Sequence, residues 1–125
     1  MSILVIGGSG FVGSSLVSYL LSKHLKVIVY IHKNLGFLDG VKHKNLKYIK
    51  DLNNLIVDDI KISTIYHAAS KLHSGVHTYE EFYKSNVELT LNIIDFAKRL
   101  GVKQFIHLST GSVFSKPKEN IIFNE

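Results

Sequence analysis

The chain has 125 residues, 46% of them hydrophobic and 20% charged, a length and composition that suit one folded domain and exclude a disordered segment. It contains no cysteine, which excludes a disulfide framework and a thiolate metal site. The formal net charge of +5 comes almost entirely from lysine, with Arg99 as the only arginine, whereas a nucleic-acid surface would usually add arginines or exposed aromatic residues.

Strand and helix patterns alternate from the first residue, which predicts βαβ units around a parallel sheet. Period-two or continuous apolar patterns predict strands over 3–6, 26–31, 46–49, 63–67 and 104–109. Helical spacing of apolar residues predicts helices over 11–23, 51–60 and 79–100, with a loop over 68–78. Asp51 is placed to cap the second helix and Gly101 to end the third.

A glycine-rich segment joins the first expected strand to the first expected helix. It fits G-x-G-x-x-G through Gly8, Gly10 and Gly13, and G-x-x-G-x-x-G when it is counted from Gly7. Such glycines allow a tight turn, a close approach of the backbone to a pyrophosphate and close packing of helix on strand. Free N–H groups at the helix start then favour a bound phosphate. The segment predicts a dinucleotide site made by Gly7, Gly10, Phe11, Val12 and Gly13.

The end of the second expected strand bears on which dinucleotide binds. An NAD site usually has Asp or Glu here to hold the ribose 2′-hydroxyl, but the chain has His32 and Lys33, and its first acidic residue is Asp39. Cations suit a 2′-phosphate, which a carboxylate would repel. NADP is therefore slightly favoured over NAD. The alternative is that His32 and Lys33 are solvated and that the backbone holds NAD.

Four segments together resemble the extended short-chain dehydrogenase/reductase family, which includes nucleotide-sugar epimerases, dehydratases and reductases. They are Gly7 to Gly13, Asp51-Leu52, Tyr66 to Ser70 and Ser109 to Phe114, and Asn86-Val87 adds a fifth match. The resemblance implies an α/β fold with a doubly wound, Rossmann-type parallel sheet of strand order 3-2-1-4-5, truncated before the later strands. Residues 1–125 would then be one NAD(P)-binding domain, incomplete and without the family's C-terminal substrate domain.

The resemblance also implies roles for single residues. Thr110 corresponds to the family's catalytic Ser/Thr, which hydrogen-bonds the reacting hydroxyl or carbonyl, and Ser109 to a contact on the nicotinamide side; the alternative is a Ser/Thr cluster that orders a turn. Asn86 would tie its helix to the strands and border the cofactor. The remaining implied cofactor contacts are Asp51, Leu52, Ala68, Ala69 and Ser70, although Asp51 equally suits a helix cap and the two alanines equally suit tight strand–helix packing.

The family's reaction also needs a Tyr-x-x-x-Lys pair. Its lysine lowers the pKa of the tyrosine, so that the phenol can pass a proton. The chain contains this spacing only at Tyr19 to Lys23, on the first expected helix, about 13 Å from the pyrophosphate end. We therefore interpret this match as coincidental. The chain is expected to bind its cofactor without turnover.

The leading hypothesis is an oxidoreductase-type enzyme acting on a nucleotide-activated sugar or a similar carbonyl or hydroxyl substrate. One alternative is a non-catalytic NAD(P)-sensing or scaffold protein, and another is a basic nucleic-acid binder. Expected partners are the dinucleotide, a small-molecule substrate and, as one option, a second copy in a homodimer. No nucleic acid, membrane or metal is expected, because no apolar run reaches ~18 residues and His73 and His77 lack a glutamate-bearing zinc motif. The simplest location is the cytoplasm.

Overall fold

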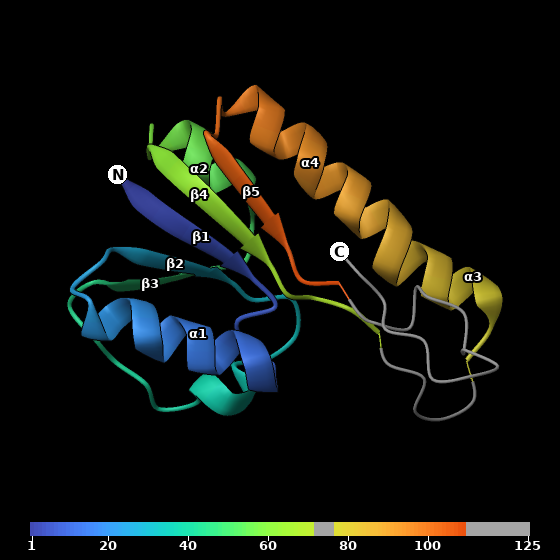
Figure 1. Ribbon diagram of the computed structural model, residues 1–125, viewed down its shortest axis with the longest axis horizontal. Helices are drawn as coiled ribbons and strands as arrows, with labels where there is room; N and C mark the ends of the chain where they lie inside the picture. The colour runs from blue at the N-terminus through green and yellow to red at the C-terminus, as the bar shows by residue number, and fades with distance from the viewer. Residues whose placement is uncertain (72–76, 110–125) are drawn as a thin grey trace, which may run out of the picture.

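The computed structural model describes residues 1–71 and 77–109. Within them, five parallel strands form one sheet in the order β3-β2-β1-β4-β5 (Figure 1). The strands are β1 (Ser2–Ile6), β2 (Val27–Tyr30), β3 (Leu46–Ile49), β4 (Ile62–His67) and β5 (Gln104–His107). The predicted Rossmann-type order is confirmed.

β1 lies at the centre of the sheet, paired with β2 on one side and β4 on the other. The exposed fraction of Leu4, Val5 and Ile6 is at most 1%. A strand covered on both faces has no side on which a polar residue is favoured, so its sequence is continuously apolar. This explains why the first strand could be recognised from residues 3–6 alone.

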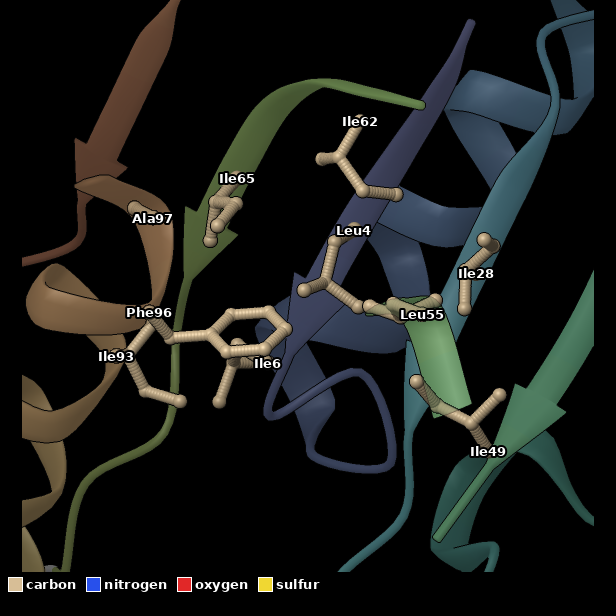
Figure 2. Packing of buried hydrophobic residues seen from close by; sticks show 10 residues of the cluster. All are labelled: Leu4, Ile6, Ile28, Ile49, Leu55, Ile62, Ile65, Ile93, Phe96 and Ala97. Atoms are coloured by element: carbon tan, nitrogen blue, oxygen red, sulfur yellow. The ribbon is translucent and has the colours of Figure 1, made fainter. Parts of the chain in front are cut away.

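The two faces of the sheet carry separate hydrophobic cores. Helix α1 (Phe11–Ser22) covers one face, where Val17 and Leu20 pack against Val5 and the apolar side chains of β2. Helices α2 (Asn53–Val57) and α4 (Leu89–Arg99) cover the other face (Figure 1). There, Leu55 and Phe96 meet the alternate residues of β1 and β4 (Figure 2).

One long helical stretch precedes β5, as predicted over 79–100. It consists of α3 (Tyr79–Phe82), η2 (Tyr83–Glu88) and α4. The six residues of η2 form a π-helix, which the apolar periodicity did not predict. Gly101 ends the stretch as expected: it has φ of 63°, and its N–H donates to Lys98 O while Val102 N–H donates to Ala97 O, the two hydrogen bonds of a Schellman motif.

The second predicted helix is shorter than expected. It spans Asn53–Val57 instead of 51–60, and Leu52 occupies the N-cap position that was predicted for Asp51. The Asp51 carboxylate still bonds locally, because its Oδ1 accepts from the Asn53 N–H at 2.9 Å. This hydrogen bond forms a local turn before the helix. The helix therefore begins at Asn53, one residue later than it would with Asp51 as the N-cap.

The loop after β2 contains a short 3₁₀ helix, η1 (Gly36–Leu38), where the sequence predicted no element. The Phe37 N–H donates to Ser9 O at 3.0 Å. Gly36 has φ of 51°, and a Cβ there would lie too close to Ser9 O. The loop therefore packs directly on the glycine-rich segment. In the described ranges, no helix is both long and apolar enough to cross a membrane.

Candidate dinucleotide site

The glycine-rich segment, Gly7 to Gly13, forms the turn between β1 and α1, and its glycines have separate roles. Gly7 has φ of 83°, and a Cβ there would lie 2.5 Å from Ala69 N. A Cβ on Gly8 would lie 2.6 Å from Val29 Cγ1. A Cβ on Gly13 would overlap Gly7 O. These three glycines therefore allow the turn to pack on its own helix, on β2 and on the loop after β4.

Gly10 differs, because a Cβ on it would meet only Gly7 O, at 3.4 Å. It is the N-cap residue of α1 and offers no side chain to the helix start. The N–H groups of Phe11, Val12 and Gly13 make no hydrogen bond to any residue in the part of the chain that the structure describes. Three free donors and the positive end of the helix dipole thus lie beside open space, which fits a phosphate group.

A cavity of about 680 Å³ lies at this turn, on the carboxyl edge of the sheet. Segments far apart in the sequence line it: the glycine-rich segment, the end of β2, the loop after β4 and one face of the long helical stretch. Its lining residues are Ile6, Gly7, Ser9, Gly10, Tyr30, His32, Lys33, Ala68, Ala69, Ser70, Lys71, Lys84, Ser85, Glu88, Leu89 and Asn92. The cavity lies at the strand ends where open α/β sheets bind ligands.

Basic side chains outnumber acidic ones around the cavity. Lys33, Lys71 and Lys84 line it together with His32, and among the described residues the one acidic lining residue is Glu88. The Lys71 ammonium is 3.7 Å from the Glu81 carboxylate, and its side chain is 26% exposed. Such a lining favours a ligand that carries more than one negative charge.

Half of the predicted cofactor contacts meet at this cavity. Gly7, Gly10, His32, Lys33, Ala68, Ala69 and Ser70 all line it. Asn86 contacts the loop after β4 through two hydrogen bonds. Its side chain accepts from the Lys71 N–H at 2.6 Å and donates to Lys71 O at 3.2 Å. This contact has the form of the predicted tie between helix and strand end.

The other predicted contacts do not line the cavity. The Asp51 carboxylate accepts a hydrogen bond from the Asn53 N–H at the start of α2. Leu52 packs against the hydrophobic core on the sheet face that α2 and α4 cover. Phe11 is 74% exposed, and its ring packs edge-on against Phe37 with 5.9 Å between the ring centroids. The cavity lining includes none of Phe11, Val12, Gly13 and Ser109. Thr110, the predicted catalytic residue, lies outside the described residues.

A second hollow of about 450 Å³ adjoins the site, because Lys33 lines both cavities. Its other lining residues are Ile31, Asn34, Leu35, Tyr48 and Lys50. Lys33 and Lys50 make no ion pair with a described carboxylate. Two free lysines therefore flank the end of β2, at the position where the sequence predicted a cationic subsite.

The sequence did not indicate Lys50 or Lys84 as site residues, and for Lys71 it favoured a solvated loop lysine over a contact with a cofactor or substrate phosphate. The positions of Lys84, Glu88 and Asn92 carry a usable signal, since polar residues four apart share one face of a helix. Lys50 carries no such signal, because only the register of β3 beside β2 brings it near Lys33. Nor was His67 given a role, although it is the one buried polar residue among those described.

Other constellations remain apart from the cavity. Within residues 1–71 and 77–109, no three His, Asp or Glu side chains gather closely enough to hold a metal ion. Tyr19 is 58% exposed, and the Lys23 ammonium lies 5.5 Å from its ring centroid. Neither residue lines either hollow.

Comparisons with known proteins agree with this geometry. The model of a family described as "NAD dependent epimerase/dehydratase family" matches residues 3–125. UDP-glucuronic acid decarboxylase 4 of Arabidopsis thaliana is 32% identical over 126 residues, which cover 96% of this chain and 28% of that protein. UDP-glucose 4-epimerase of Haemophilus influenzae is 30% identical over 133 residues, which cover 94% of this chain and 39% of that protein.

Among solved structures, MoeE5 in complex with UDP-glucose and NAD is 30% identical, with a TM-score of 0.75 over 94% of this chain and 39% of that one. The curated relatives named above are each matched over less than two fifths of their own length. The similarity therefore concerns a part of those proteins, and it covers nearly all of this chain.

Proposed function

Because the chain belongs to the NAD-dependent epimerase/dehydratase family, we propose that it is the cofactor-binding part of an NAD(P)-dependent enzyme acting on a nucleotide-activated sugar or a similar carbonyl or hydroxyl substrate. The observation that carries this proposal is the cavity at the start of α1, where three unpaired N–H groups lie beside Gly10. The UDP-sugar names of the relatives support the substrate class.

The residues of the site fit a dinucleotide. The N–H groups of Phe11, Val12 and Gly13 would bind the pyrophosphate, and the space beside Gly10 admits it. Ala68 and Ala69 present little side chain, so a ring can lie against their backbone. Lys71 and Lys84 add positive charge at the same opening. The bound nicotinamide would supply the hydride chemistry, and these residues hold and orient it.

We also propose that NADP binds more tightly than NAD. His32 and Lys33 follow β2, Lys33 and Lys50 line the adjoining hollow, and no carboxylate from residues 1–71 and 77–109 lines that hollow. A ribose 2′-phosphate would meet at least two cations there. This arrangement supports the preference that the sequence suggested.

Turnover is proposed to need residues beyond the described cavity. Thr110 is our candidate for the group that contacts the reacting hydroxyl or carbonyl. The only Tyr-x-x-x-Lys of the chain, Tyr19 to Lys23, lies on α1 and does not line the cavity. We therefore expect cofactor binding without catalysis from these 125 residues.

A homodimer and a cytoplasmic location stay predictions. The dimer is supported by an exposed apolar stripe on the long helical stretch, whose members are spaced by four: Tyr79, Tyr83, Val87 and Leu91. Residues four apart share a helix face. Sedimentation velocity at rising concentration tests the dimer, and a constant monomer mass contradicts it.

Titration of the purified chain with NADP⁺ and NAD⁺ by calorimetry tests the proposed function. Gly10→Ala is the sharpest variant, because Gly10 has φ of −80° and an added Cβ meets only Gly7 O. The variant should fold and yet lose binding about tenfold or more, since the methyl group occupies the phosphate position. Gly8→Ala is the comparison, expected to lose stability first because its Cβ would meet Val29. Wild-type protein that binds neither nucleotide contradicts the proposal.

A further inference from the structure

A continuous chain of hydrogen bonds runs from the buried end of β4 to the wall of the cavity. His67 Nε2 is 2.9 Å from Thr90 Oγ1, and the Thr90 hydroxyl donates to Asn86 O at 2.8 Å. The Asn86 side chain then makes both hydrogen bonds to the backbone of Lys71. Residues from β4, α4 and η2 are thereby connected to the loop that lines the site.

The order of donors fixes the protonation of His67. Thr90 has one hydroxyl proton, which it donates to Asn86 O, so Thr90 Oγ1 must accept from His67. His67 therefore carries a proton on Nε2. The other ring nitrogen, Nδ1, is buried and has no hydrogen-bond partner among the described residues.

An unpaired buried nitrogen lowers stability, and in a native protein it calls for an explanation. His67 is 0% exposed and packs edge-on against Phe105 at 6.2 Å. A phenylalanine would fill this space without an unpaired nitrogen. A purely structural role therefore does not account for histidine at this position, whereas a required donor to Thr90 does.

The far end of the chain contacts the cofactor site. Ala68, Ala69, Ser70 and Lys71 line the cavity, and a Cβ on Gly7 would lie 2.5 Å from Ala69 N. The loop and the phosphate turn are thus in close contact, so a displacement of the loop changes the width of the cavity. The connection enters this loop through η2, a π-helix, and such turns are frequent at functional sites.

We propose that His67 is a positioning residue that, through Thr90 and Asn86, holds the loop Ala68–Lys71 in its dinucleotide-binding position. This inference rests on the proposed function, because its consequence is cofactor affinity. His67 does not line the cavity; its ring is connected to Lys71 through the Thr90 hydroxyl, the Asn86 carbonyl and the Asn86 side chain.

The first test compares Thr90→Val with Thr90→Ser. Valine keeps the shape of threonine and removes the hydroxyl, whereas serine keeps the hydroxyl. We expect Thr90→Val to weaken NADP⁺ and NAD⁺ binding about tenfold and to speed hydrogen exchange of the Lys71 amide. Thr90→Ser should stay within about twofold of wild type. Thr64→Val is the matched control, because Thr64 lies on β4 and lines neither hollow.

The second test compares His67→Phe with His67→Gln. The Phe variant removes the donor and also the unpaired nitrogen, so the melting temperature should not fall while affinity for both nucleotides does. A purely structural histidine would give the opposite result. A Gln side chain offers an N–H to Thr90 and should restore part of the affinity.

The two proposals fail in different ways. If wild type binds a nucleotide and both Thr90→Val and His67→Phe bind it equally well, with unchanged exchange at Lys71, the positioning role is wrong. If wild type binds neither nucleotide, the proposed function is wrong. In that case, faster exchange at Lys71 in Thr90→Val still reports the mechanical connection, and unchanged exchange overturns it.

Discussion

His67 makes the stability of the protein dependent on pH. Burial, helped by the nearby His107 ring 5.0 Å away, lowers its pKa from 6.5 to about 4. The unfolded chain therefore binds a proton at this histidine below pH 6.5, whereas the folded protein resists it until about pH 4. Stability from this source is complete above pH 6.5 and is lost as the pH falls through that window.

We expect the free energy of unfolding to fall by up to about 3 kcal/mol between these two pH values on account of His67. Urea denaturation at a series of pH values measures it. His67→Phe removes the titrating group and should flatten this part of the profile. A slope that is the same in wild type and in His67→Phe would show that other groups are responsible.

Lys33 and Lys50 should decide between the two dinucleotides. Both flank the hollow beside the end of β2, and neither has a described acidic partner. We expect Lys33→Ala and Lys50→Ala each to weaken NADP⁺ binding about fivefold, because solvent screens exposed lysines. Affinity for NAD⁺, which lacks the 2′-phosphate, should hardly change.

Lys44→Ala is the control for this pair, since Lys44 is an exposed lysine that lines neither hollow. Equal losses for NADP⁺ and NAD⁺ in the Lys50 variant would mean that Lys50 acts on the whole molecule's charge and not on a 2′-phosphate. Competition titrations at fixed ionic strength measure these affinities.

At the scale of single elements, α2 depends on one side chain. The helix has five residues, too few for stability of its own, and its Leu55 is fully buried in the core shared with α4 (Figure 2). Leu55→Ala should lower the free energy of unfolding by about 3 kcal/mol. Ile56→Ala, at a side chain that is 46% exposed, should cost much less.

Chemical denaturation of both variants measures this difference. Because α2 follows β3 and covers the face that holds Ile49 and Ile28, the loss in Leu55→Ala should appear in the cooperative unfolding of the whole domain. Equal, small losses in the two variants would show that α2 does not pack as described.

The long helical stretch shows what apolar spacing can and cannot predict. Its existence and its end at Gly101 followed from the sequence, which placed its apolar face at Phe82, Tyr83, Val87, Leu91, Ile94 and Ala97. That face is wrong in part, because Tyr83, Val87 and Leu91 are exposed and the buried residues of α4 are Ile93, Phe96 and Ala97. The π-helix at Tyr83–Glu88 did not follow, because it coincides with polar contacts that Asn86 makes across the loop. Spacing reports which face is buried, and it does not report hydrogen bonds between distant segments.

For the whole molecule, the alternation of apolar strands with amphipathic helices predicted a parallel α/β sheet, and the resemblance to the family implied its strand order. Gly7 and Gly10 could be assigned to the site since a phosphate turn needs glycine at fixed spacing. Lys50 and Lys84 could not, since their nearness to Lys33 and Ala68 depends on strand register and on the approach of η2. For Asp51 the resemblance implied a cofactor contact and the sequence equally suited a helix cap; in the structure its carboxylate accepts a hydrogen bond from the Asn53 N–H, and the cofactor contact stays a prediction.

Cofactor binding should stabilise the whole domain, because the cavity is assembled from β1, β2, β4 and the long helical stretch, and the unfolded chain has no such site. At a nucleotide concentration 100 times the dissociation constant, linkage gives about 2.7 kcal/mol. For a domain of this size, that corresponds to a rise in melting temperature of roughly 10 °C. Scanning fluorimetry with NADP⁺ measures the shift, and Gly10→Ala, which should bind about tenfold more weakly or worse, should reduce it to about half or less at the same nucleotide concentration while retaining the ligand-free melting temperature. A shift of equal size with an unrelated polyanion such as heparin, lost at high salt, would indicate non-specific binding to exposed lysines instead.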